Sequence, residues 1–398
     1  MKHNKNYRWF ILGIGVLAQI IFAMGFAGIP VTNLLMKTEY KFSVVELGYV
    51  LGAMGLGVAC SELVWGILTD KLGDKLILAL GLFSSSLVFM YISFYLTPEI
   101  KYSINYIYLS LALGLAGICG GSINSSSGRT VMSWFSDSER GFAMSIRQTA
   151  IPIGGAIGTG LLPFLAWQYG FTFMFFFLAI AGIIIGTIVI FFIKSNDLSI
   201  KDNINHYDEV SVFYNKDIWL IIMASAFLTV PQMSVLTFGG IYLEESFGVS
   251  LFIISFLLIG VQICGGILRI WSGHYTDKNK NRIVLMKNYS LLGTISALIL
   301  AFFSNNNILG LIFLIFTGLW GHAWHGIAYT EVAVKAGINK AGTALGMIGT
   351  AVFISSFLTP ILISQVITYF NWNLAWLVVG ILTLLAYICF ILVTKKDL

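Results

Sequence analysis

The stretch GILTDKLGDK, residues 66–75, determines how the chain is organised. It is short and polar, and it separates two apolar runs, 45–68 and 76–96. Each run has the length of about 20 residues that a helix needs to cross a bilayer. The sequence therefore predicts a tight turn between two membrane spans. The two glycines would let the helix ends approach, and Asp70 would cap the next helix or pair with a basic group.

A second copy of this pattern lies 207 residues further along the chain (277 − 70 = 207). Residues 273–278 read GHYTDK and repeat the G-x-x-T-D-K frame of residues 66–71, again between two apolar runs. A shared frame at matching places in a membrane chain indicates internal duplication.

The composition is that of a membrane protein. Hydrophobic residues make up 58% of the chain, charged residues 10%, and the mean hydropathy is +0.87. Soluble globular chains carry about 25% charged residues. The net charge of +5 is best explained by membrane topology, so no nucleic-acid partner is expected. The four cysteines have no metal-ligand spacing, and neither a metal site nor a cofactor is predicted.

Twelve apolar spans predict an all-α integral membrane protein of two pseudo-symmetric six-helix halves. The halves would be 1–193 and 217–398, joined by a polar cytoplasmic linker, 194–216. The predicted spans are 9–36, 45–69, 76–96, 105–132, 142–166, 171–193, 218–246, 251–275, 284–304, 308–334, 342–370 and 374–393.

The distribution of basic residues predicts the orientation. With the N-terminus inside, the cytoplasmic segments hold 17 of the 23 lysines and arginines, and the outside loops hold 3. Basic residues accumulate on the cytoplasmic side of membrane proteins. Both termini are therefore expected in the cytoplasm, with the protein in the plasma (inner) membrane as a monomer.

The stretch at 66–75 resembles the loop between helices 2 and 3 of the major facilitator superfamily, whose pattern is G-x-L-a-D-r-x-G-r-k. Asp74 stands where that family usually has a base. The residues that match are Gly66, Leu68, Asp70, Lys71, Gly73 and Lys75. The resemblance implies two halves that rock around a site near the membrane midplane and open it to one side at a time.

The resemblance also assigns candidate gating residues near the cytoplasmic face. Arg129 is similar to an arginine on the fourth helix of the superfamily, and it is expected to pair with Asp70 or Glu139. Arg140-Gly141 resembles the loop that precedes the fifth helix. The full candidate gating set is Gly66, Asp70, Lys71, Gly73, Gly273, Asp277, Arg129 and Arg140.

Ionisable residues inside the spans are candidates for function, because burying a charge in a membrane costs several kcal/mol. Arg147 is either a structural salt-bridge residue or a contact for an anion, since a guanidinium offers a planar fork to carboxylate or phosphate. Gln148 beside it and Gln19 in the first span are candidate substrate-binding residues. Helix packing is an equally open role for Gln19.

Glu62 and Arg269 occupy matching places, each eight residues before the repeated aspartate (70 − 62 and 277 − 269). Eight helical residues rise about 12 Å, so both lie inside the membrane. They could form a fixed ion pair, a gate, or one substrate contact from each half. His322 and His325 have the i, i+3 spacing of one helix face. They are candidates for proton coupling together with Glu62, or else a hydrogen-bonded pair in a polar core.

The predicted function is secondary transport of a small molecule, driven by a proton or substrate gradient as in a symporter. No phosphate-binding G-x-x-x-x-G-K-[ST] motif is present, so ATP is not the expected energy source. Arg147 and Arg269 outnumber the one deep acid, Glu62. This balance favours an organic anion, an amino acid or a carboxylate-bearing chelator as substrate.

Three alternatives stay open. Residues 151–155, IPIGG, partly resemble the G-P-x-x-G-G motif of drug/proton antiporters, but no glycine precedes the proline. A sensor that kept the transporter fold without turnover is the second alternative. A membrane-embedded enzyme is the third, and the short polar loops and the missing nucleophile motif argue against it. The expected partners are therefore a small solute, protons and the lipid bilayer.

Overall fold

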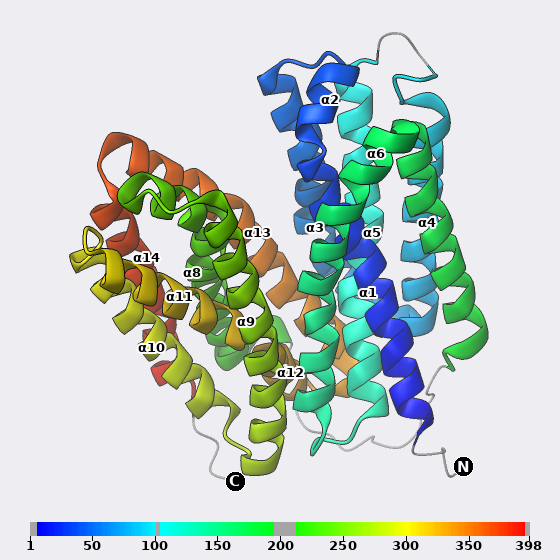
Figure 1. Ribbon diagram of the computed structural model, residues 1–398. Coiled ribbons are helices and arrows are strands. Elements are labelled where there is room, and N and C mark those ends of the chain that lie inside the picture. Colours follow the sequence, from blue (N-terminus) through cyan, green and yellow to red (C-terminus); the bar gives the residue numbers. More distant parts are fainter. Residues whose placement is uncertain (1–5, 101–103, 195–211, 395–398) are drawn as a thin grey trace. The chain divides into compact units, whose positions relative to one another are not determined.

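The computed structural model describes residues 6–100, 104–194 and 212–394 (Figure 1). Regular structure within these ranges consists of helices. Most of the expected linker, 195–211, lies outside them, as do several lysines used for the topology prediction.

The chain forms two compact units, and unit 1 comprises residues 1–136, 147–205 and 337–350. Helix α5 is central to unit 1 and packs against α1, α3 and α4. The first turns of α13 belong to this unit although they lie late in the sequence. The helices that contribute are α1 (Tyr7–Val31), α2 (Asn33–Glu39), α3 (Val44–Leu72), α4 (Asp74–Tyr95), α5 (Tyr106–Trp134), α6 (Arg140–Phe192), η2 (Ile338–Lys340) and α13 (Ala341–Tyr369).

Unit 2 comprises residues 137–146, 206–336 and 351–398. Within it, α11 packs against α8, α9 and α10, and α14 packs against α8 and α10. It also takes the first turns of α6 and the rest of α13. Its other helices are η1 (Val212–Tyr214), α8 (Lys216–Phe247), α9 (Leu251–Asn279), α10 (Arg282–Phe302), α11 (Asn307–Ala323), α12 (His325–Ala336) and α14 (Trp372–Leu392).

The twelve predicted spans are confirmed. Eleven helical stretches of the described chain are long and apolar enough to cross a membrane. One of them, α6, contains two of the predicted spans, and the non-helical backbone of Gly170 (φ 84°, ψ 166°) separates them. A residue with a side chain rarely adopts this conformation. The chain turns back here, as Figure 1 shows.

The predicted polar hinge at 66–75 is shorter than expected. Helix α3 continues through Asp70 to Leu72, and α4 begins at Asp74. The turn is the single residue Gly73, with φ 90°. In the second copy, α9 likewise continues to Asn279 and ends at Lys280, with φ 54°. A helix satisfies its own backbone hydrogen bonds, so it can extend into the polar residues at the end of a span.

The first and tenth spans are also divided. Helix α1 ends at Val31, and the short α2 follows Thr32. In the tenth span Trp324 separates α11 from α12 and lies between the two candidate histidines.

Asparagine side chains cap the N-termini of several spans. Asn105, Asn215, Asn306 and Asn371 precede α5, α8, α11 and α14, and each side chain accepts a backbone N–H from the following turn. Such caps satisfy donors that the helix itself leaves unpaired.

Glycines bring α1 and α6 into backbone contact within unit 1. A Cβ built on Gly158 would overlap the carbonyl oxygen of Met24, and one on Gly154 would overlap that of Ile20. A Cβ on Gly28 would in turn overlap the backbone of Gly158. Small residues allow this approach between membrane helices. Packing inside one unit is therefore the role of these glycines.

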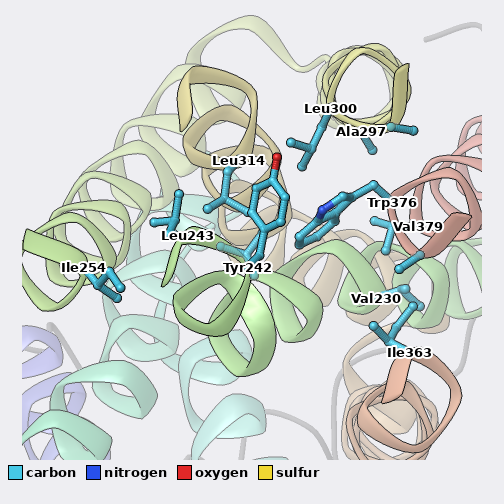
Figure 2. Packing of buried hydrophobic residues seen from close by; sticks show 13 residues of the cluster. Val230, Tyr242, Leu243, Ile254, Ala297, Leu300, Leu314, Ile363, Trp376 and Val379 are labelled. Atoms are coloured by element: carbon cyan, nitrogen blue, oxygen red, sulfur yellow. The ribbon is translucent and has the colours of Figure 1, made fainter. Parts of the chain in front are cut away.

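Unit 2 has a hydrophobic core around Tyr242 and Trp376, shown in Figure 2. Tyr242 of α8 packs against Trp376 of α14, with ring centroids 5.4 Å apart. The Tyr242 hydroxyl donates to the carbonyl oxygen of Ser304 at 2.7 Å. Leu300 of α10 and Leu314 of α11 belong to the same cluster. A buried tyrosine normally needs such a partner for its hydroxyl.

Candidate functional site

Arg147 is the centre of a buried polar network in unit 1. Its side chain is fully buried on α6. Its Nη2 lies 2.9 Å from Gln19 Oε1, 2.5 Å from Asn124 O, 2.6 Å from Asn124 Oδ1 and 2.9 Å from Ser127 Oγ. Its Nε also donates to Ser127 Oγ, at 3.1 Å. An Nη2 group carries two hydrogens, so these four neutral oxygens compete for them.

Glu62 joins this network through Asn124. The Asn124 amide nitrogen donates to Glu62 Oε1. Glu62 is fully buried on α3, and within the described residues its Oε2 has no hydrogen-bond partner. A Cβ built on Gly349 of α13 would overlap the carboxylate, so the glycine makes room for it.

The structure brings together three of the predicted residues of the first half. Gln19, Arg147 and Glu62 belong to one network, and Gln19 contacts the guanidinium directly. Gln148 is fully buried next to Arg147 in the chain. Their roles in substrate binding stay predictions.

Arg269 and the two histidines form a separate cluster in unit 2. Arg269 Nε donates to the carbonyl oxygen of His322 at 3.0 Å, and its Nη2 lies 3.2 Å from His325 Nδ1. A guanidinium can only donate, so His325 Nδ1 is the acceptor and carries no proton. His322 Nδ1 lies 2.8 Å from the carbonyl oxygen of Gly318 and is therefore protonated.

This geometry favours the polar-core interpretation of the histidines in the conformation described. A proton added at His325 Nδ1 would break the hydrogen bond and place two cations 3.2 Å apart. Trp324 stacks on the same imidazole, with ring centroids 3.8 Å apart. Proton coupling through this pair stays a prediction.

Asp70 connects the end of α3 to the start of α13 within unit 1. Its carboxylate accepts the backbone N–H groups of Gly342 and Thr343 at 2.8 and 2.6 Å, and the Thr343 hydroxyl at 2.6 Å. It also pairs with Arg129, whose Nε is 3.1 Å away. The predicted ion pair is confirmed, whereas the expected cap of the next helix is wrong. The helix that Asp70 caps is α13, because tertiary packing brings that N-terminus closer.

Asp277 makes the matching contacts within unit 2. Its carboxylate accepts the backbone N–H groups of Gly141 and Phe142, at 3.0 and 2.7 Å, at the start of α6. Arg282 Nη2 lies 3.1 Å from the same carboxylate. Negative charge at a helix N-terminus is stabilising. The repeated aspartates thus perform the same structural task in both units.

The other candidate gating residues lie around these two contacts. A Cβ on Gly66 would overlap the backbone of Gly342, and one on Gly273 would overlap that of Gly141. Gly73 forms the α3–α4 turn. Lys71 is exposed, and Arg140 is half-buried at the first position of α6.

Replacing Asp277 with Asn is expected to lower the free energy of unfolding by about 3 kcal/mol. The change leaves the buried Arg282 without its nearest anion, and removing one partner of a buried pair is costly. The measurement is thermal unfolding of the purified protein in detergent. A midpoint within about a degree of wild type would contradict the ion-pair interpretation.

Asp137→Asn is the matched control, because Asp137 reaches the same Arg282 at 3.6 Å but has an exposed side chain, 52% accessible. Exposed pairs contribute about 0–1 kcal/mol, so little change is expected.

Partial burial alone would raise the pKa of Asp137. The Lys280 hydrogen bond and the charges of Arg282, Lys280 and Arg140 outweigh it and hold that pKa below the ordinary value. The stabilisation is present above about pH 4 and is lost as the pH falls through the lowered pKa, so its contribution is constant between about pH 5 and 8.

Two residues of the Arg147 network were not predicted from the sequence. Asn124 and Ser127 belong to the polar run 122–127 in the middle of the fourth span. A polar run inside an apolar span was the available clue. For metals, the described part of the chain contains no group of three or more His, Cys, Asp or Glu side chains that could hold an ion.

Comparison with known proteins places the chain among membrane transporters. It is 26% identical over 332 residues to an uncharacterised MFS-type transporter of Mycobacterium tuberculosis, covering 83% of this chain and 73% of the relative. It is 30% identical over 239 residues to the glycerol-3-phosphate transporter of Bacillus subtilis, about half of each chain (53% and 52%). It is 22% identical over 429 residues to the probable galactarate/D-glucarate transporter GarP of Escherichia coli K12, covering 98% and 96%.

Solved structures and a family model agree with these relatives. The proton:xylose symporter XylE matches with a TM-score of 0.77 at 16% identity, over 98% of this chain and 97% of that one. The transporter FucP in its outward conformation matches with a TM-score of 0.74 at 15% identity, over 96% and 99%. These two likenesses show the fold. The family model described as Major Facilitator Superfamily matches residues 15–360. This protein is therefore a membrane transporter, not an enzyme, and it belongs to the Major Facilitator Superfamily.

Proposed function

We propose that this protein is a secondary transporter of small organic anions, with carboxylate-bearing solutes as the first class to test. The observation that carries the proposal is Arg147, a fully buried guanidinium whose Nη2 is surrounded by four neutral oxygens. These four oxygens share two hydrogens, so none of them holds an N–H alone. An entering carboxylate can therefore displace a neutral acceptor from Nη2, because its charge makes the stronger hydrogen bond.

The electrostatics support an anion. Burying a charge in a membrane protein is costly unless a partner compensates it, and a charge-assisted hydrogen bond is about twice as strong as a neutral one. An anion would thus bind Arg147 more strongly than the amide, carbonyl and hydroxyl oxygens that hold it. A cationic solute would meet repulsion at the same place.

The relatives favour the same class of solute. Glycerol 3-phosphate, galactarate and D-glucarate, which the names of two relatives mention, are all anions at neutral pH. Arg269, buried in unit 2, is a second guanidinium of the kind that can bind an anion.

Alternating access would be controlled at the two aspartate contacts. Asp70 holds the start of α13, and Asp277 holds the start of α6. Both contacts consist of hydrogen bonds to a helix N-terminus, which can separate without breaking a helix. We place them at the cytoplasmic face, with both termini in the cytoplasm of a monomer in the plasma membrane, because the basic residues are concentrated there.

A thermal-shift screen of the full-length protein in detergent tests the proposal. The probes are D-gluconate, D-galactarate, glycerol 3-phosphate, D-galactose and tetraphenylphosphonium. At a hundredfold excess over Kd, a specific ligand stabilises by about 2.7 kcal/mol. We expect a carboxylate or the phosphate ester to stabilise, and the same compound to accumulate in proteoliposomes under an inward proton gradient.

The other outcomes are equally informative. Stabilisation by the cation alone would replace this proposal with the drug/proton antiporter. Stabilisation by an anion without uptake in either direction would indicate a sensor. Stabilisation by D-galactose alone would show a neutral sugar transporter.

A further inference from the structure

Asn124 contacts both the buried acid and the buried base of unit 1. It lies on α5 and is 2% exposed. Its Nδ2 donates to Glu62 Oε1, and its Oδ1 accepts from Arg147 Nη2 at 2.6 Å. The carboxylate and the guanidinium are thus joined through a single amide.

The orientation of this amide is fixed by its two partners. A guanidinium only donates, so the amide oxygen must face Arg147. An ionised carboxylate only accepts, so the amide nitrogen must face Glu62. The backbone oxygen of Asn124 accepts from the same Nη2 at 2.5 Å, which holds the residue in place. Turning the amide over would set oxygen against carboxylate and nitrogen against guanidinium.

Glu62 has room to take up a proton. Its Oε1 accepts from Asn124, and within the described residues its Oε2 has no hydrogen-bond partner. A side chain at Gly349 would fill the space that the carboxylate occupies. A proton on Oε2 would therefore leave the Asn124 contact intact.

Arg147 is the charged group that acts on Glu62 in the middle of the bundle. The helices that pack on α3 carry their other charges near the ends of the spans. Asp74 and Lys75 begin α4, and Arg8 lies in the first turn of α1. Asp70 and Arg129 are paired with each other about 12 Å further along the helix. The remaining charges are Lys37 and Glu39 of α2 and Lys340 of η2, while α13 has no charged residue.

We propose that Asn124 couples protonation of Glu62 to anion binding at Arg147. The proposal rests on the proposed function and assigns its coupling residue. Ionised Glu62 polarises the amide and strengthens the hold of its oxygen on Arg147, since linked hydrogen bonds reinforce one another. Protonation of Glu62 removes this reinforcement and leaves the cation uncompensated. The guanidinium then binds an anion in place of the amide oxygen.

The charges balance for one proton and one monoanion. The empty site holds one carboxylate and one guanidinium, with a net charge of zero. The loaded site holds a neutral acid, a guanidinium and an anion, again with a net charge of zero. Either ligand alone would leave a net charge in a buried site, which is costly. By linkage, the anion raises the proton affinity of Glu62 by the same factor by which the proton raises anion affinity.

The test measures anion affinity against pH for the full-length protein in detergent. The probe is the monoanion D-gluconate, whose carboxylate stays ionised between about pH 5.5 and 8.5. In the wild type we expect Kd to rise about tenfold as Glu62 ionises, within the usual range of coupling. Glu62→Gln should bind as tightly as the protonated wild type, with no dependence on pH.

The variants at Asn124 separate coupling from simple positioning. Asn124→Leu should make the Kd of the anion independent of pH. Asn124→Asp should move the midpoint of the profile to higher pH, because a second carboxylate beside Glu62 favours its protonated form. Ser127→Ala is the matched control, since Ser127 contacts Arg147 but is not part of the link to Glu62. It should keep the wild-type dependence of Kd on pH.

Each outcome decides the proposal. If Kd depends on pH in Asn124→Leu as it does in the wild type, the proposal is overturned. If that variant does not fold, an Asn124→Asp variant whose Kd changes around the same pH as in the wild type overturns it as well. Binding to the wild type without any pH dependence would overturn the coupling but leave the anion transporter in place. No binding of D-gluconate to the wild type at any pH, together with no stabilisation by any anion of the screen, would overturn both.

Discussion

Replacing Arg147 with Gln is expected to abolish anion binding, with a loss of at least about a hundredfold in affinity, or roughly 2.7 kcal/mol. Each hydrogen bond to a charged group contributes about 1.5–3 kcal/mol. A neutral glutamine cannot supply the fork or the charge. The measurement is the thermal shift produced by the anion identified in the screen. Arg147→Lys should recover part of the affinity, because it keeps the charge but loses the planar geometry.

Arg147→Gln is also expected to lower the free energy of unfolding by about 3–5 kcal/mol, since it leaves Glu62 buried without its cation. The double variant Arg147→Gln with Glu62→Gln is the control. It should regain most of the stability while anion binding stays absent. Wild-type anion affinity in Arg147→Gln would remove the basis of the proposed function.

Replacing Gly158 with Ala is expected to destabilise the protein by about 2–3 kcal/mol, because the new methyl group would overlap the backbone of α1. The clash involves the carbonyl oxygen and Cα of Met24, neither of which can rotate away. Relieving it requires α1 and α6 to separate along the whole contact. Small-residue contacts of this kind hold membrane helices together, so the loss extends beyond one methyl group.

Gly160→Ala is the matched control, two residues further along the same helix and with nothing within 4 Å of its Cβ position. Both substitutions gain the same helix propensity, about 0.5–1 kcal/mol, so the difference between them isolates the contact. Thermal unfolding in detergent measures both. Equal midpoints would show that α1 and α6 do not approach closely in solution.

Hydropathy and repetition predicted the architecture because they reflect local requirements. Each span must be about 20 apolar residues long, and each must satisfy its own backbone. The repeated Gly-x-x-Thr-Asp-Lys frame marked two equivalent places, and Asp70 and Asp277 do make equivalent contacts. Glu62, Arg147 and Arg269 could be recognised because a charge inside an apolar span is rare.

The partners of these groups could not be predicted in the same way. Asp70 caps α13, whose first turn is more than 270 residues away in the sequence. Asn124 is an ordinary amide in a polar run, and its position between an acid and a base exists only after α3, α5 and α6 pack together.

The sequence alone predicts twelve membrane spans, a repeated Gly-x-x-Thr-Asp-Lys frame, and the few charged residues that lie inside the spans. Each of these follows from the cost of moving polar groups out of water, which is a property of the residue and its neighbours in the chain. Tertiary packing sets which oxygens surround Arg147. It also sets which helix N-terminus donates its backbone N–H groups to Asp70 and which to Asp277. A buried polar group takes whatever partner packing brings within about 3 Å, and that partner comes from distant parts of the chain.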